Sequence, residues 1–198
     1  MPRWEVGVTA GFIQANPREG SEEPYRDDWY FTGRYAVSAG RFWSRHLETE
    51  VEFATTGNGE RYTNRYSNVP GVPTYYTVNI RERFRVHQLS GRVVWQFLDN
   101  SWVHPYVFGG ITGEAERRQV WIPEQYFNAG PDTRNPANRI LVSPAVDQTS
   151  TTFRAGATAG AGTKVYMSPG SYFNAGFVVS RARPSTTVSF IAGFGWDF

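Results

Sequence analysis

The sequence predicts an all-β protein, built as an eight-stranded antiparallel up-and-down transmembrane β-barrel. Three observations lead to this prediction. Apolar residues alternate with polar or small residues at a period of two along most of the chain, which is typical of strands. Short and longer connections follow one another in turn between the alternating segments. The chain is also rich in aromatic residues, at 16%, and in glycine, although it is hydrophilic on average.

Composition excludes several other classes of protein. The chain has 198 residues, and we expect residues 1–198 to form a single domain. It has no cysteine, which excludes disulfides, a thiol nucleophile and cysteine metal ligands. No stretch approaches the roughly 18 consecutive apolar residues of a transmembrane helix. The net charge is only +2 and the acidic residues are interspersed with the basic ones, so we do not expect a nucleic-acid partner.

The first four predicted strands place large apolar side chains on one parity and polar or small ones on the other. The apolar set starts at Trp4, and in the second strand Arg41 departs from the pattern. In the third strand the polar set is acidic. In the fourth strand Phe84 is out of phase with the residues that follow, which predicts a β-bulge near Val86–Gln88. These strands are residues 4–13, 29–43, 47–55 and 84–97.

The last four predicted strands follow the same rule. In the fifth, Val107 and Ile111 alternate with small and polar residues. In the sixth, alanines alternate with glycines, and Lys164 lies on the glycine side. The eighth is the clearest, because aromatic and aliphatic residues occupy one parity up to Phe198. These strands are residues 103–114, 152–167, 172–180 and 187–198.

The connections predict a barrel with one plain end and one elaborated end. Tight turns are expected at residues 44–47, 98–101 and 168–171. Longer connections are expected at residues 16–28, 58–75, 121–147 and 181–185. The third of these is rich in Pro, Asn, Asp and Gly, which predicts an irregular loop. In a membrane barrel, this alternation corresponds to short periplasmic turns and longer extracellular loops.

A membrane barrel has its apolar face outward, whereas a soluble, ligand-carrying barrel has its apolar face inward. The polar parity carries charges of both signs in mid-strand and otherwise holds mostly glycine, serine, threonine and alanine. A narrow eight-stranded lumen needs such small residues beside long paired ones. We therefore expect the polar face inside, as a buried charge network rather than a catalytic carboxylate cluster. Its predicted members are Glu5, Arg34, Glu48, Glu50, Glu52, Arg92, Arg154 and Lys164.

Tryptophans gather at the ends of the predicted strands, as they do at the two interfaces of a bilayer. Most fall beside the short turns or the termini, whereas Trp29 and Trp121 fall at the opposite rim. Two aromatic belts of this kind favour the membrane barrel. The predicted membrane-interface aromatics are Trp4, Trp29, Trp43, Trp95, Trp102, Trp121, Trp196 and Phe198.

Two stretches resemble known outer-membrane proteins. Residues 193–198 (GFGWDF) are similar to the terminal aromatic signature of that group, and residues 105–110 (PYVFGG) resemble the fifth-strand motif of small OmpA/OmpX-like outer-membrane β-barrels, barrel domain only. The resemblance implies a monomeric, porin-like barrel in the outer membrane of a Gram-negative bacterium, with its signal peptide removed. It also implies insertion by the barrel-assembly machinery, which would read Trp196 and Phe198.

Neither enzymatic activity nor a cofactor is expected. The histidines, His46, His87 and His104, lie on different predicted strands or turns, and none has a serine beside it in the pattern of outer-membrane lipid A deacylases. No pair of ligand residues has a spacing that suits a metal ion. The glycine pairs precede no helix, so they predict close packing rather than a phosphate-binding loop.

The expected function is structural or surface-interacting, through extracellular loops on a rigid barrel with a filled lumen. The alternatives are a narrow pore, a barrel that interacts with lipid or a small molecule with residues 121–147 folding over its mouth, and a soluble lipocalin-like carrier. Arginine forks at strand ends suit the phosphates of lipopolysaccharide, although a solvated rim would also hold them. The predicted lipopolysaccharide contacts are Arg81, Arg83, Arg85, Arg117 and Arg118.

Overall fold

A computed structural model describes residues 4–16, 30–66, 69–73, 76–98, 102–129, 138–183 and 185–198. Within these ranges no helix is long and apolar enough to cross a bilayer. The strands are β1 (Trp4–Asn16), β2 (Tyr30–Phe42), β3 (Leu47–Thr56), β4 (Gly59–Tyr66), β5 (Thr77–Gln96), β6 (Val103–Ile122), β7 (Gln125–Asn128), β8 (Arg139–Ser143), β9 (Val146–Ser168), β10 (Ser171–Ala182) and β11 (Ser185–Asp197).

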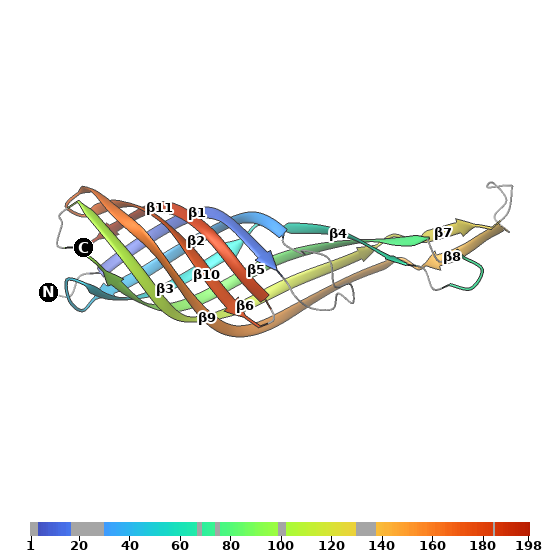
Figure 1. Ribbon diagram of the computed structural model, residues 1–198, viewed down its shortest axis with the longest axis horizontal. Helices are drawn as coiled ribbons and strands as arrows, with labels where there is room; N and C mark the ends of the chain where they lie inside the picture. Colours follow the sequence, from blue (N-terminus) through green and yellow to red (C-terminus); the bar gives the residue numbers. More distant parts are fainter. Residues whose placement is uncertain are drawn as a thin grey trace. The chain divides into compact units, whose positions relative to one another are not determined.

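The sheet closes on itself (Figure 1). Neighbouring strands pair in the order β3-β2-β1-β11-β10-β9-β6-β5-β4, and a further pairing of β3 with β5 completes the ring. Strands β3 and β4 both pair with β5 and are separated only by residues 57–58, so they count as one strand of the wall. The wall therefore has eight strands. The predicted eight-stranded antiparallel up-and-down barrel is therefore confirmed, and closure leaves the ring without an open edge.

The strand register sets like side chains side by side. Along β1 and β11, Val8 lies opposite Phe194 and Gly7 lies opposite Gly195. On the other side of β1, Val8 lies opposite Val37 of β2. Because side chains alternate between faces, this register keeps apolar rows on one face of the sheet and small or polar rows on the other.

The polar rows face inward and the apolar rows face outward. Glu5, Arg34 and Lys164 are buried, whereas Phe31 and Phe190 are each 67% exposed on the outer wall. A protein dissolved in water rarely exposes a continuous aromatic and aliphatic surface of this extent. The outer wall is therefore suited to lipid, as the alternation of the sequence predicts.

Strand β5 corrects one prediction. From Glu82 to Gln96 its even-numbered residues are all buried, so Phe84 and Val86 face the same side as Arg92. Its pairing with β3 also has one register up to His87. The predicted bulge near Val86–Gln88 is wrong, because these apolar residues belong to the inward parity.

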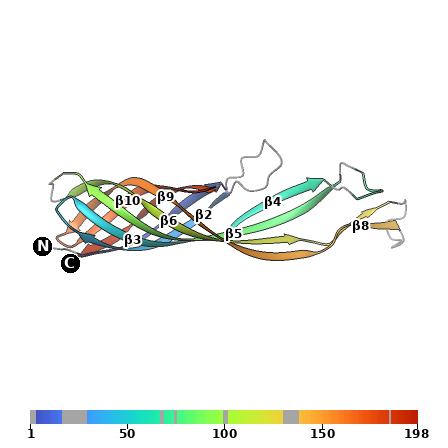
Figure 2. The same cartoon turned by 90° about the horizontal axis from the view of Figure 1, so that it is seen from below.

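The chain divides into two compact units. The barrel unit consists of Met1–Gly59, Arg85–Glu116 and Thr152–Phe198. The second unit, here called the sheet unit, consists of Glu60–Phe84 and Arg117–Thr151. In the barrel unit the strands wind around a common axis (Figure 2).

The sheet unit occupies segments that the sequence predicts to be loops. The stretch 58–75 contains β4, and the stretch 121–147 contains the antiparallel pair β7–β8, so the loop predictions are wrong for these parts. In the barrel unit, the connection predicted at 181–185 is tighter than expected, with Ala182 paired opposite Ser185. An apolar cluster of Val72, Val78 and Val142 holds the sheet unit together. Partly buried side chains pack against this cluster: Val69, Tyr76, Ile80, Ile122, Phe127 and Ile140.

Candidate functional site

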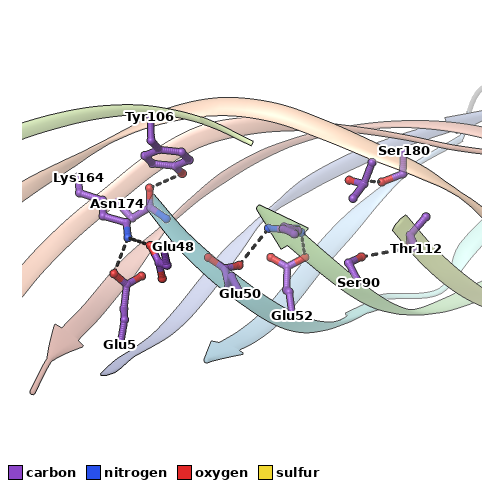
Figure 3. A network of polar contacts seen from close by, with 12 residues as sticks. Glu5, Glu48, Glu50, Glu52, Ser90, Tyr106, Thr112, Lys164, Asn174 and Ser180 are labelled. Carbon is purple, nitrogen blue, oxygen red and sulfur yellow. Dashed lines mark hydrogen bonds and ion pairs between the residues drawn. The ribbon is translucent and has the colours of Figure 1, made fainter. Parts of the chain in front are cut away.

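Lys164, the only lysine of the chain, is buried in the lumen between two carboxylates (Figure 3). Its Nζ donates to Oε2 of Glu5 at 2.5 Å and to Oε2 of Glu48 at 3.1 Å. The Tyr172 hydroxyl donates to the other oxygen of Glu5 at 2.5 Å, and Gln96 Nε2 donates to Glu48 at 3.3 Å. These side chains come from β1, β3, β5, β9 and β10, so the cluster connects strands on different sides of the barrel through the lumen.

A second cluster is centred on Glu52. Arg34 of β2 and Arg92 of β5 both donate to Oε1 of Glu52, and all three side chains are buried. Arg92 Nη1 also donates to Oε1 of Glu50 at 3.3 Å. The Arg92 guanidinium lies 4.5 Å from the ring centre of Phe108. Two carboxylates thus face two guanidinium groups, which leaves the cluster neutral.

Between these clusters the lumen is almost filled. The cavity there has a volume of about 20 Å³, which holds about one water molecule. Hydroxyl pairs, visible in Figure 3, continue the polar filling along the barrel. Ser90 donates to Thr112 at 3.0 Å, and Ser180 donates to Thr158 at 3.1 Å. The described lumen therefore offers no continuous aqueous path through these layers.

Glycines make room for the long lumen side chains. A β-carbon on Gly195 would overlap the ring of Tyr172, and one on Gly162 would overlap the hydroxyl end of Tyr106. A β-carbon on Gly40 would meet the carboxylate of Glu48. Within the stretch 156–162, Gly160 and Gly162 therefore serve the close packing expected from the sequence, against Phe108 and Tyr106, whereas Gly109 has open space at its β-carbon position.

The structure brings together seven of the eight predicted lumen charges and places the eighth elsewhere. Arg154 Nη1 donates to Oε2 of Glu116 at 2.7 Å, in a separate buried pair. Nearby in the sequence, Glu114 accepts a bond of 2.6 Å from Gln88. Glu116 is absent from the predicted set because the predicted strand ends at residue 114, although Glu116 shares the parity of Glu114. Tyr172, on the inward parity of β10, is a further lumen residue absent from the predicted set.

Glu5, Glu48 and Glu50 are the one group of carboxylates among the described residues that lie close enough to hold a metal ion. Lys164 Nζ already donates to two of the three carboxylates. Its ammonium group supplies the positive charge that a metal would bring, and it occupies the carboxylate oxygens of Glu5 and Glu48 that a metal would need. The donor set therefore does not suit a metal ion.

Predicted interface aromatics ring the end of the barrel where the short turns lie. Trp4 and Phe198 exchange backbone hydrogen bonds of 2.9 Å, so they are at one level. Arg41 lies 4.4 Å from the ring centre of Trp43 and 5.6 Å from that of Trp4, which accounts for its departure from the apolar pattern. The predicted interface aromatics that are exposed at this end are Trp4, Trp43, Trp95, Trp102, Trp196 and Phe198. Trp29 lies outside the described residues.

The sequence predicts Trp121 at the start of a loop, but the structure places it within a strand. It is the second-last residue of β6, in the sheet unit, and 45% of its surface is exposed.

An arginine–glutamate cluster covers one face of the sheet unit. Arg81 Nη2 donates to the two carboxylate oxygens of Glu60 at 2.8 and 3.0 Å, and Arg83 Nε donates to Glu60 at 2.7 Å. These bonds, first from Arg81 and then from Arg83, lower the pKa of Glu60 below its ordinary value. The carboxylate in turn fixes both guanidinium groups on one side of the sheet.

The opposite face of the sheet unit carries a different cluster. Arg61 and Arg118 both donate to Glu82, and both guanidinium groups lie over the buried ring of Phe84, at 5.5 and 5.7 Å from its centre. Of the five predicted lipopolysaccharide contacts, Arg118 therefore faces away from Arg81 and Arg83. Arg85 and Arg117 are exposed on the same parity as Arg81 and Arg83.

The fold is shared with solved structures of outer-membrane proteins. A major outer membrane protein of Thermus thermophilus matches with a TM-score of 0.58 at 13% identity, over 100% of each chain. Neisserial surface protein A matches with a TM-score of 0.56 at 13% identity, over 98% of this chain and 97% of that one. OprG from Pseudomonas aeruginosa matches with a TM-score of 0.54 at 10% identity, over 98% and 95%. The chain has the fold of small outer-membrane β-barrels. No protein-family model and no curated protein matches the sequence.

On this outer-membrane β-barrel fold, the apolar outer wall has one hollow of about 540 Å³. Its lining includes three large apolar side chains, Phe53, Leu89 and Phe153, and two small residues, Gly113 and Ala115. Phe153 is 80% exposed, so the hollow opens on the outer wall. Its surface is mainly apolar, which suits a hydrocarbon chain.

Proposed function

We propose that the protein is a non-conducting outer-membrane barrel of a Gram-negative bacterium, which presents the sheet unit for interaction at the cell surface. The observation that carries the proposal is the filled lumen. Two buried ionic clusters occupy it, of which the one around Lys164 bonds across the barrel, and the space between them holds about one water molecule. An eight-stranded wall with such contents serves as an anchor rather than as a passage.

The exposed face of the sheet unit supports the interaction role. Arg81, Arg83 and Arg117 lie on this face, and arginine forks bind phosphate oxygens with two parallel hydrogen bonds. Lipopolysaccharide is therefore the proposed partner of these side chains, together with Arg85 on the same parity of β5. Because Arg118 is committed to Glu82 on the other face, it is left out of this group.

A non-enzymatic role is part of the proposal. His46 Nδ1 bonds the carbonyl of Gln96 at 3.0 Å, and His87 Nδ1 pairs with Thr55 Oγ1 at 3.0 Å. His104 packs edge-on against Tyr166. The three imidazoles thus have separate structural partners and do not converge on one nucleophile.

The proposed route into the membrane uses the C-terminal aromatics. Trp196 and Phe198 are 49% and 71% exposed at the end of the last strand. They are therefore accessible to the barrel-assembly machinery, which is the proposed partner during insertion.

Single-channel recording in planar bilayers tests the closed lumen. We expect wild-type protein to give no reproducible conductance steps. The double variant Glu52→Ala/Arg92→Ala removes the central plug and should give steps, whereas the surface control Arg117→Ala should not. Stable steps from the wild type would overturn the proposal in favour of a narrow pore.

A second candidate function, lipid binding, is favoured by the hollow around Phe153. A single acyl chain of a membrane lipid would fit between Phe53, Leu89 and Phe153. Filling the hollow with Ala115→Leu should then reduce the number of lipid molecules that stay bound through detergent purification, measured by mass spectrometry. Unchanged lipid retention would dismiss this candidate and leave the surface role unaffected.

A further inference from the structure

The exposed face of the sheet unit contains a shallow hollow of about 210 Å³. It is lined by Arg81 and Arg83 of β5 and by Gln119 and Trp121 of β6. All four occupy odd-numbered positions of adjacent antiparallel strands, so their side chains emerge on the same face. The hollow therefore combines two cations, one amide and one large aromatic ring.

The two arginines are held in position before any ligand arrives. Glu60 accepts hydrogen bonds from both, and the guanidinium of Arg81 also lies 5.5 Å from the ring centre of Tyr62. Such contacts reduce the side-chain entropy that a ligand would otherwise have to remove on binding. Arg83 donates to Glu60 through Nε alone. Its terminal Nη1 and Nη2 groups make no hydrogen bond within the described part of the chain, so both remain for an anion.

The charge balance of the hollow favours an anion. Two guanidinium groups line it, and the carboxylate of Glu60, which bonds to both, neutralises one of the two charges. Gln119 Nε2 donates to Asp147 at 3.0 Å, which fixes the amide while its oxygen stays available as an acceptor. No carboxylate belongs to the described lining itself. An ester phosphate or sulfate would therefore meet donors rather than negative charge.

Trp121 adds a second kind of contact. Its ring is 45% exposed beside the arginines, so it offers a flat apolar surface next to charged donors. Sugar rings present flat faces of C–H groups that pack on indole, and their hydroxyl groups donate to amide oxygens such as that of Gln119. A bare inorganic anion would use the arginines and leave the tryptophan without a role.

We propose that this hollow binds an anionic sugar, meaning a saccharide that carries a phosphate or sulfate ester. Arg83 and Arg81 hold the ester group, Trp121 packs on the sugar ring, and Gln119 accepts a hydroxyl. The proposal deepens the surface-interaction role and rests on it for the location of this face outside the membrane. Two sources share the chemistry: the phosphorylated sugars of lipopolysaccharide and soluble sulfated glycans.

Calorimetric titration of the full chain in detergent micelles tests the site with four probes. They are N-acetylglucosamine 1-phosphate, N-acetylglucosamine 6-sulfate, unmodified N-acetylglucosamine and inorganic phosphate. We expect saturable binding of at least one sugar ester, and binding at least about tenfold weaker to the neutral sugar, since the loss of one hydrogen bond between charged groups changes affinity by about tenfold or more. Preference for the phosphate ester indicates lipopolysaccharide as the source, and preference for the sulfate ester indicates a soluble glycan.

Three variants separate the roles of the residues. Arg83→Gln should weaken ester binding about tenfold or more, and Arg83→Lys should lie between it and the wild type because the fork is lost and the charge kept. Trp121→Ala should weaken the sugar esters but not inorganic phosphate. The matched control Arg118→Gln removes the same charge from the opposite face and should leave affinity unchanged. A heat-dependent gel shift checks that each variant is folded.

The proposal is overturned if no sugar ester binds saturably, if Arg118→Gln weakens binding as much as Arg83→Gln, or if Trp121→Ala leaves ester affinity unchanged. This titration does not depend on the state of the lumen. Conductance by the wild-type barrel would therefore reject the non-conducting anchor function. The sugar site would still be tested by the titration alone.

Discussion

Replacing Glu52 by Gln should destabilise the barrel by about 3–5 kcal/mol, the usual cost of removing one partner from a buried ion pair. Glu52 is 3% exposed and accepts hydrogen bonds from both Arg34 and Arg92. Together with Glu50, these residues make a cluster of two negative and two positive charges. Glu52→Gln changes that sum from zero to +1 in an almost filled lumen, where water cannot compensate.

Reversible urea unfolding in lipid vesicles, followed by tryptophan fluorescence, measures this loss. The control Glu60→Gln also removes a carboxylate that binds two arginines, but on the exposed face of the sheet unit. It should destabilise the protein far less than Glu52→Gln, because exposed ion pairs contribute little to stability. The double variant Glu52→Gln/Arg92→Gln returns the cluster charge to zero and should be less destabilised than the sum of the single variants. A loss below about 1 kcal/mol for Glu52→Gln would refute the ionic account of the lumen.

Three further predictions concern packing, pH and the outer wall. Gly195→Val should destabilise the barrel by about 1–3 kcal/mol, because the added side chain meets the ring of Tyr172; unfolding equal to that of wild type would contradict the packing in the lumen. The lowered pKa of Glu60 means that its bonds with Arg81 stabilise the sheet unit fully above the ordinary glutamate pKa and are lost as pH falls through the lower folded value. The protection of β4 amides from hydrogen exchange, relative to their intrinsic exchange rates, should therefore fall in acid, and Glu60→Gln should abolish that pH dependence; an unchanged profile in the variant would reject the assignment. Phe190→Arg, on the outer wall, should cost up to about 2–4 kcal/mol in lipid vesicles, whereas a solvent-facing wall would tolerate it.

Sequence periodicity predicts the barrel because each strand repeats the same physical constraint. Glu48, Glu50 and Glu52 share one parity, and placing them inside follows from the small residues that accompany them on that side. What periodicity cannot supply is the pairing across strands. Arg154 was grouped with the central charges, yet the register brings it to Glu116.

The missed strands have a different physical reason. Residues 121–147 are rich in Pro, Asn and Gly, so local propensity favours a loop. Strands β7 and β8 lie there because Val142 packs with Val72 and Val78, which are distant in the sequence. Tertiary contacts of this kind override local propensity and leave no signal in the segment itself.

Phe84 shows how an apolar residue on the polar parity can mislead. Its phase predicts a β-bulge near Val86–Gln88, but Phe84 is a buried ring between Arg61 and Arg118. The same limit applies to the hollow at Arg81 and Trp121, because neither parity nor composition indicates that these two residues of different strands meet.

The accessibility of nitroxide labels along β11 in lipid bilayers tests the central claim most directly. Because the chain has no cysteine, single cysteines can be placed one at a time from 188 to 195 without competing thiols. Labels at Phe190, Ala192 and Phe194 should be open to lipid-soluble oxygen, and labels at Ser189 and Ile191 should be closed to both oxygen and a water-soluble nickel chelate. Access of the nickel chelate to Ser189 or Ile191 would show a water-filled lumen and contradict the account.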